Sequence, residues 1–181
     1  MTGLWRRSEN RRLPQLAGWM LCLALLAPGA SSADTLLPLQ YAQCYGGNSM
    51  PAGSFCMPSA LAVGDQGRLF VADGLNHRVQ RLISDGALLQ VWGHRGVAQG
   101  QFFQPSDLAW APDGSLWVAD RGNGRLQRFT QEGELLACWS LHEVADHPAM
   151  PNAVTCAPDG SLWVVDAGQA AVSHYSPDGE L

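Results

Sequence analysis

The chain has 181 residues, with 11 basic against 16 acidic residues and a formal net charge of −5 at pH 7. All 11 basic residues are arginines, and four of them precede residue 34, so the remainder carries 7 arginines against 15 acidic residues, a net charge of −8. Nucleic-acid binding requires basic surface that releases counterions. The composition therefore excludes nucleic acid as an expected partner.

The first 33 residues have the pattern of a secretory signal peptide. A basic head precedes an apolar run of 12 residues (16–27), and small residues stand at 31 and 33, the −3 and −1 positions. A spanning helix needs about 20 apolar residues, so a membrane anchor is the weaker interpretation. We predict cleavage after residue 33 and a secreted or periplasmic protein without a membrane partner. An uncleaved signal anchor is the alternative.

From residue 57 onward the sequence repeats itself three times. Pro58, Pro105 and Pro151 each precede an apolar run and are 47 and 46 residues apart, and recurring glycines and aspartates keep the same period. The predicted units are 57–103, 104–149 and an incomplete third unit, 150–181. Residues 34–56 before them are expected to hold a lone strand and its connection.

Each unit is predicted to contain four short strands. In the second unit these are SDLAWA (106–111), SLWVAD (115–120), GRLQRF (124–129) and ELLACW (134–139), separated by turns rich in glycine, aspartate and proline. Four short strands in about 40–50 residues are typical of one blade of a β-propeller. The expected fold class is therefore all-β.

The motifs GLNHRVQRL and GNGRLQRF, each preceded by VAD, resemble NHL repeats. This resemblance covers nearly all of residues 40–181 and implies a β-propeller of six blades, of which three are visible. The third unit departs from the pattern, since Gln169, Ala171 and His174 replace the asparagine and the two arginines of its sister units.

Two arrangements would complete such a ring. LQYAQCYGG (39–47) aligns with the fourth strand of a unit, and the last unit stops after its third strand. The sequence is then either part of a six-bladed protein, or half of a homodimer in which each chain donates its first strand to the other.

The cysteines of an exported chain favour disulfide bonds. Cys44 and Cys138 take equivalent places in their fourth strands, and Cys56 lies just before, and Cys156 within, the first strand that follows. We predict the bridges Cys44–Cys56 and Cys138–Cys156. A buried thiol at Cys156, in mid-strand, is the alternative to the second bridge.

Residues that recur at the period are interpreted as architecture. Asp120, Asn123 and Arg125 recur as Asp73, Asn76 and Arg78, so we expect them to hold the turn between the second and third strands of each blade. An aromatic position in the second strand recurs as well and is expected to pack between blades: Phe70, Trp117 and Trp163.

Ligand-binding candidates are sought in the loops that share one rim of a propeller. Those loops hold Asn76, His94, Arg95, Arg121, His142 and His147. The segment HEVADH (142–147) resembles a zinc-protease HExxH motif but has one residue too many between Glu143 and His147. No metal ligand and no catalytic residue is predicted.

Two enzyme families were compared with the units. Peptidyl-hydroxyglycine amidating lyases place zinc-binding histidines directly after the proline that starts a blade, where this chain has Ser59, Ser106 and Asn152. The gluconolactonase and SMP-30 group begins with Pro-Asn-Gly, which Pro151–Ala153 matches in part, making Asn152 a further ligand candidate.

The sequence thus favours an exported binding or scaffold module for a peptide, glycan or protein partner over an enzyme. The alternatives are a metal-dependent hydrolase of the gluconolactonase type and, less favoured, an amidating-lyase-like enzyme. No cofactor is predicted, although the sequence does not exclude a bound calcium or zinc ion.

Overall fold

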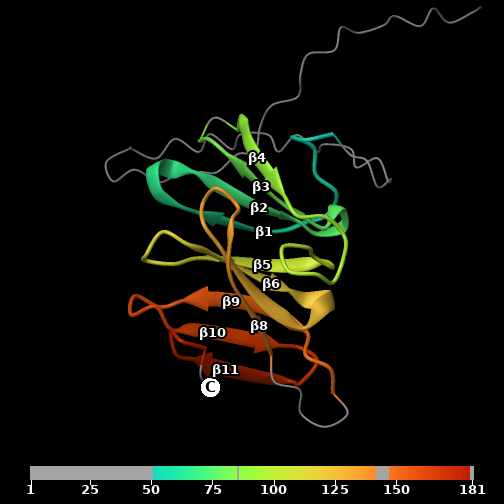
Figure 1. Cartoon of the computed structure of the whole chain (residues 1–181), viewed down its shortest axis with the longest axis vertical. Helices are drawn as coiled ribbons and strands as arrows, with labels where there is room; N and C mark the ends of the chain where they lie inside the picture. Colours follow the sequence, from blue (N-terminus) through green and yellow to red (C-terminus); the bar gives the residue numbers. More distant parts are fainter. Residues whose placement is uncertain (1–50, 85, 142–146, 180–181) are drawn as a thin grey trace, which may run out of the picture.

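The computed structural model describes residues 51–84, 86–141 and 147–179. Within them, 11 strands form three antiparallel sheets with the strand orders β1-β2-β3-β4, β5-β6-β7-β8 and β11-β10-β9. Figure 1 shows the three sheets one above another along the long axis of the molecule. The all-β propeller architecture is confirmed, with three consecutive blades of a partial propeller.

The strands follow the predicted units. Blade 1 contains β1 (Pro58–Val63), β2 (Leu69–Asp73), β3 (Arg78–Leu82) and β4 (Leu88–Trp92). Blade 2 contains β5 (Pro105–Trp110), β6 (Leu116–Asp120), β7 (Arg125–Phe129) and β8 (Leu135–Ser140). Blade 3 contains β9 (Pro151–Cys156), β10 (Leu162–Asp166) and β11 (Ala171–Tyr175). Short 3-10 turns follow β2 and β6: η2 (Gly74–Asn76) and η3 (Arg121–Asn123).

The first strand of each blade lies innermost and contacts the first strand of the next blade. The Ser59 hydroxyl donates to the carbonyl oxygen of Pro105 at 2.7 Å, and the Ser106 hydroxyl donates to that of Pro151 at the same distance. Hydroxyls at the position where amidating lyases carry zinc-binding histidines therefore join blades here. Asn152 takes this position in blade 3 and is exposed.

Apolar faces of neighbouring blades form the core. Phe70 of blade 1 and Trp117 of blade 2 are buried in two successive interblade clusters, as the repeat predicts. The third member of the series differs, because Trp163 is 47% exposed and stacks on His174 with ring centroids 4.3 Å apart. The two ways of completing the ring stay predictions.

The loops lie on two opposite edges of the blades. We call "connection rim" the edge that holds η2, η3 and the connections between blades: residues 74–77, 93–104, 121–124, 147–150 and 167–170. We call "turn rim" the edge with the turns that join strands one to two and three to four of each blade: residues 64–68, 83–84, 86–87, 111–115, 130–134, 157–161 and 176–179.

The predicted Cys138–Cys156 bridge is wrong, because both residues are free thiols. Cys138 lies in β8, the outermost strand of blade 2, whereas Cys156 ends β9, the innermost strand of blade 3. Three strand spacings, roughly 14 Å, separate these radial positions, and a disulfide bond tolerates a Cα separation of at most about 7 Å.

Other predictions fall on residues that the structure does not describe. The signal peptide (1–33), the lone strand at 39–47 and His142 lie outside the described residues, as does Cys44, so the Cys44–Cys56 bridge stays a prediction. Among the residues that are described, no helix has the length and apolar character needed to cross a membrane.

One buried ring anchors the connection between blades 1 and 2. Phe102 is 0% exposed and packs in the cluster between these blades. A Cβ on Gly93, whose φ of +83° also favours glycine, would overlap that ring. We expect Phe102→Ala to lower the free energy of unfolding by about 3–5 kcal/mol, as large-to-small core substitutions do.

Urea unfolding measures this loss. Val97→Ala is the matched control, since Val97 lies in the same connection with its side chain 79% exposed. It should change the free energy of unfolding by about 0.5 kcal/mol or less. Equal effects of the two substitutions would contradict the anchoring role of Phe102.

Candidate functional site

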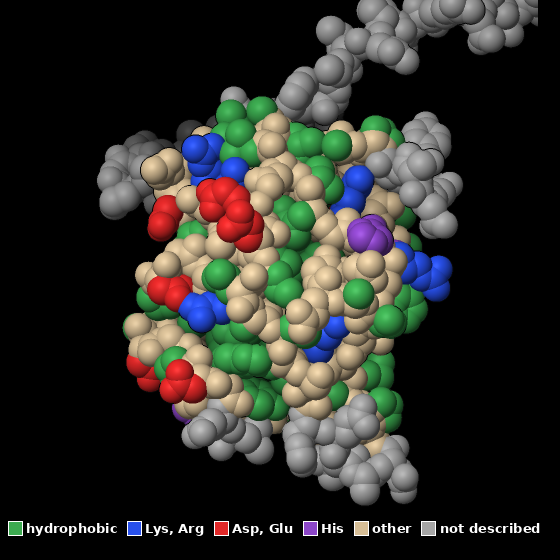
Figure 2. Space-filling view, in the orientation of Figure 1, with side chains coloured by type: hydrophobic (Ala, Val, Ile, Leu, Met, Phe, Trp, Pro, Cys, Tyr) green, Lys and Arg blue, Asp and Glu red, His purple; other side chains and the backbone are tan. Residues whose placement is uncertain are grey.

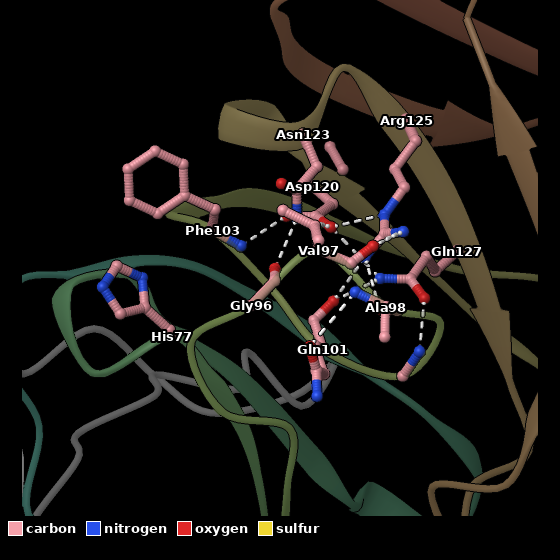
Figure 3. A network of polar contacts seen from close by, with 12 residues as sticks. His77, Gly96, Val97, Ala98, Gln101, Phe103, Asp120, Asn123, Arg125 and Gln127 are labelled. Atoms are coloured by element: carbon pink, nitrogen blue, oxygen red, sulfur yellow. Dashed lines mark hydrogen bonds and ion pairs between the residues drawn. The ribbon is translucent and has the colours of Figure 1, made fainter.

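The recurring aspartate is the centre of a buried polar network in blade 2 (Figure 3). The Asp120 carboxylate is 0% exposed. Its Oδ1 accepts from the Phe103 amide at 2.7 Å, and its Oδ2 accepts from the side chains of Asn123 and Arg125, each at 2.8 Å, and of Gln127 at 3.2 Å. The network therefore holds both the turn after β6 and the connection that enters β5.

Arg125 extends this network to the connection between blades 1 and 2. Its guanidinium donates to the backbone carbonyls of Val97, Ala98 and Gln101 at 2.7–2.8 Å, while its Nε is paired with Asp120. Gln127 adds a bond to the carbonyl of Gln101, also drawn in Figure 3. One arginine and one glutamine thus clamp the preceding connection onto the blade.

Blade 1 repeats this clamp. The Asp73 carboxylate accepts from the Cys56 amide at 2.6 Å and pairs with Arg78 at 2.8 Å. Arg78 and Gln80 both donate to the carbonyl of Ser54 in the preceding segment. Asn76, a predicted ligand-binding residue, donates to Asp73 and so belongs to this clamp. The structural interpretation of the repeated residues agrees with these contacts.

Blade 3 keeps the aspartate but lacks its charged partner. Oδ1 of Asp166 accepts from the backbone amides of Met150, Gly168 and Gln169 at 2.9–3.0 Å. Ala171 and Ser173 stand where blade 2 has Arg125 and Gln127. The described part of the connection before blade 3 is therefore not clamped by an arginine.

The clamp of blade 2 places an aromatic and cationic group on the connection rim. The ring of Phe103 lies 5.5 Å from the His77 ring, and the guanidinium carbon of Arg95 lies 5.2 Å from the Phe103 ring centroid. Figure 3 shows His77 and Phe103 facing each other beside the network. We call Phe103, His77, Arg95 and the adjoining Arg121 the rim patch.

His77 is held as a neutral hydrogen-bond acceptor. Its Nδ1 accepts from the Gln104 amide at 2.9 Å, and its backbone is left-handed with a φ of 54°. Partial burial and then the charge of Arg95 lower the pKa of His77, although the carboxylates of Asp120 and Asp73 oppose the shift. The rim patch therefore carries its positive charge on arginine.

Arg121 contributes a guanidinium with unused donor capacity. Its Nε is buried and has no hydrogen-bond partner in the part of the chain that the structure describes. It directly precedes Gly122, whose amide donates to the Phe103 carbonyl at 2.7 Å. The structure thus places the guanidinium of Arg95, predicted from sequence, near the Phe103 ring, and it places Arg121, also predicted, next in the chain to the glycine that binds the Phe103 carbonyl.

Of the other predicted candidates, His142 lies outside the described residues, and the rest have no hydrogen bond, ion pair or ring contact with the rim patch among the described residues. His94 is exposed, and its Nε2 lies 2.9 Å from the side-chain amide nitrogen of Gln101. His147 is also exposed, on the connection before blade 3, and Asn152 is exposed on β9. Among the described residues, no three histidine, cysteine, aspartate or glutamate side chains gather as metal ligands would.

The two rims differ in charge. Exposed carboxylates lie along the turn rim: Asp65, Asp113, Glu132, Glu134, Asp159 and Asp178. None of the described residues of the connection rim is an exposed acid, because Asp73, Asp120 and Asp166 are buried. In Figure 2 the red acidic side chains lie toward the left edge, with blue ones beside them, while the right side shows blue and purple side chains without red ones.

Comparison with protein-family profiles identifies the type of repeat. The family profile described as NHL repeat matches residues 55–82 and 102–129. The chain contains two NHL repeats. These matches cover the parts of blades 1 and 2 from the clamped segment to the third strand. A comparison with curated protein sequences finds no match.

Solved structures with similar folds include three named enzymes. A virginiamycin B lyase from Staphylococcus aureus has 20% sequence identity and a TM-score of 0.54, over 68% of this chain and 39% of the lyase. A streptogramin B lyase has 20% identity and a TM-score of 0.56, over 68% and 38%. A gluconolactonase from Xanthomonas campestris has 22% identity and a TM-score of 0.51, over 73% and 49%. This chain shares the fold of these enzymes, and it spans less than half the length of each.

Sequence reasoning missed two parts of the site. Gln80 and Gln127 recur at the period and could have been recognised as clamp residues by the same argument as the arginines. Phe103 gave no such signal, because its equivalent in blade 1 is Cys56 and its position follows from the Asp120 contact.

Removing the clamping arginine tests the network. Arg125→Gln removes three bonds to the connection and leaves the buried Asp120 carboxylate without its charged partner. Breaking a buried ion pair on one side costs about 3–5 kcal/mol, and we expect a loss of that size in urea unfolding. Arg68→Gln, at a half-buried arginine of the turn rim, is the control and should stay within about 0.5 kcal/mol.

The lowered pKa of His77 predicts a pH dependence of stability. Below its ordinary pKa of about 6.5 the unfolded chain binds the proton more readily than the folded chain. Wild-type stability should therefore fall as the pH drops from 6.5 toward the lower folded-state pKa. His77→Asn suits the left-handed backbone and should flatten this part of the profile in urea unfolding at pH 5–8. Parallel profiles for the two proteins would show that His77 has no such role.

Proposed function

We propose that this chain is an exported, non-catalytic β-propeller module that binds an acidic segment of a protein or peptide on its connection rim. The observation that carries the proposal is the difference in charge between the described residues of the two rims. The whole chain has a net charge of −5, yet the described residues of the connection rim expose arginine and histidine without an exposed acid.

The contacts of the rim patch support a carboxylate-bearing ligand. Guanidinium groups bind carboxylates through paired hydrogen bonds. Arg95 lies near the half-buried Phe103 ring, and Arg121 directly precedes Gly122, which binds the Phe103 carbonyl. Neither arginine has an ion pair among the described residues, whereas Arg81 of β3 and Arg128 of β7 are paired with Glu132 and Asp113 of the turn rim. Two guanidinium groups thus remain for a partner.

The clamp supports the proposal by fixing the patch before binding. Phe103 is held by Asp120 and Gly122, and the connection that carries Arg95 is held by Arg125. Ligand binding then has little loop entropy to overcome. Export rests on the signal-peptide pattern of residues 1–33.

A hydrolase of the gluconolactonase type is the alternative function. A gluconolactonase is among the proteins of similar fold, and Asn152 matches one position of that group's pattern. Hydrolysis of δ-gluconolactone by the purified chain, with metal analysis of the same sample, separates the two proposals. Turnover with a stoichiometric bound metal would replace the binding module by the hydrolase.

Fluorescence anisotropy with labelled hexaglutamate tests the binding module directly. The double variant Arg95→Gln/Arg121→Gln should raise the Kd about tenfold, since each exposed or half-buried ion pair contributes up to about 1 kcal/mol. Arg68→Gln removes an arginine from the opposite rim and should change the Kd less than twofold. Binding should weaken at high salt because the contacts are screened.

Two further probes define the partner class. Labelled hexalysine should not bind, and an oligogalacturonate should bind more weakly than hexaglutamate if the partner is a peptide. Preference for the oligogalacturonate would assign the rim patch to a glycan. Equal weakening of hexaglutamate binding by the Arg68 variant and the double variant would disprove a site at the rim patch.

A further inference from the structure

A cleft of about 240 Å³ opens between blades 2 and 3 on the turn rim, the opposite edge from the rim patch. Its walls come from the turns of both blades and from two strands of blade 2: Ala111, Pro112, Asp113, Trp117, Arg128, Pro158, Asp159, Gly160 and Pro177.

The equivalent place between blades 1 and 2 is filled by an indole ring. Trp110 stacks on Phe70 with ring centroids 5.1 Å apart and an interplanar angle of 20°. It also lies against Gly64, where an added Cβ would be 3.1 Å from the indole. A tryptophan side chain thus closes the first interblade gap.

Residues one repeat period after this group lie at the cleft or next to it. The residues 47 positions after Gly64 and Phe70 are Ala111 and Trp117, and both line the cleft. The residue 46 positions after Trp110 is Cys156, a free thiol that packs at the edge of the cluster between blades 2 and 3. The cleft therefore lies where blade 3 lacks the indole that its sister blade supplies.

An arginine also changes its role between the two gaps. In blade 1, Arg81 crosses to blade 2 and donates to the Gln131 carbonyl at 2.6 Å. Its equivalent, Arg128, stays on its own blade, where it donates to the Ser115 hydroxyl at 2.8 Å and pairs with Asp113. Its hydrogen bond and its ion pair are thus both made within blade 2, whereas those of Arg81 cross to the next blade.

The walls combine a hydrophobic surface with a negative charge. Three prolines and Ala111 supply apolar contacts, and the guanidinium carbon of Arg128 lies 5.4 Å from the Trp117 ring centroid. The exposed Asp159 carboxylate accepts two bonds from Ser161, both at Oδ1. These bonds, with a smaller contribution from His174, lower the pKa of Asp159, so it is ionised at neutral pH.

We propose that this cleft binds a flat aromatic ring that carries an amino group. The ring would take the place that Trp110 occupies in the sister gap, and the ammonium group would lie beside Asp159. An apolar cavity of about 150 Å³ made by removing a large side chain is known to bind benzene, so this cleft has room for a bicyclic ring. The proposal does not depend on binding at the rim patch.

Titration calorimetry with three indoles tests the proposal. Tryptamine should bind with one site per chain and at least fivefold more tightly than indole, and indole more tightly than indole-3-propionate, whose carboxylate would face Asp159. Asp159→Asn should remove the preference for tryptamine over indole while leaving indole binding within twofold.

The decisive variant fills the gap between blades 2 and 3 with a tryptophan side chain. Cys156→Trp supplies the missing indole and should weaken tryptamine binding at least tenfold, whereas the near-isosteric Cys156→Ser should leave it within twofold. The thermal unfolding midpoint of Cys156→Trp, expected at or above the wild-type value, shows that the variant is folded. Saturable binding retained in a folded Cys156→Trp protein, or no binding of any indole to the wild type, would overturn the proposal. If Cys156→Trp does not fold, Asp159→Asn decides, because an unchanged preference for tryptamine is then the contradicting result.

Discussion

The described structure depends on one buried carboxylate in each blade. A carboxylate removed from water costs several kcal/mol unless it is paired and hydrogen-bonded. Asp120 meets this cost with an amide of the incoming connection, two side-chain amides and Arg125. Because one donor comes from the connection and the others come from the blade, the carboxylate is satisfied only when the two are joined.

Blade 3 shows which part of this network the fold requires. Asp166 is 3% exposed and is satisfied by three backbone amides, so the turn and the entry of β9 are held without arginine. The core between blades 2 and 3 forms nonetheless. The arginine and glutamine therefore act on the connection, because they hold the segment that carries Arg95 and Phe103. The described residues of the connection before blade 3 show no such patch.

Periodicity made the architecture predictable, because a residue that recurs every 46 or 47 positions has the same surroundings each time. The blades, the turn role of Asp120 and Arg125, and the burial of Trp117 follow from it. The prediction of a Cys138–Cys156 bridge was wrong because aligning the repeats gives equivalent positions along the chain. It does not give the distance between the outermost strand of one blade and the innermost strand of the next. The role of Phe103 and the cleft between blades 2 and 3 could not be predicted, since each depends on how one unit packs against the next.

The same periodicity separates what the fold needs from what it leaves free. Trp110 and Cys156 occupy one position, yet the strands on either side pair in the same register in both blades. Cys56 and Phe103 likewise share a position and the same amide bond to the buried aspartate. A side chain at such a place can change from tryptophan to cysteine, or from cysteine to phenylalanine, without loss of strand pairing. Functional differences between the blades therefore concentrate at the rims and at the gaps between sheets, where the repeat fixes the backbone and leaves the side chain unconstrained.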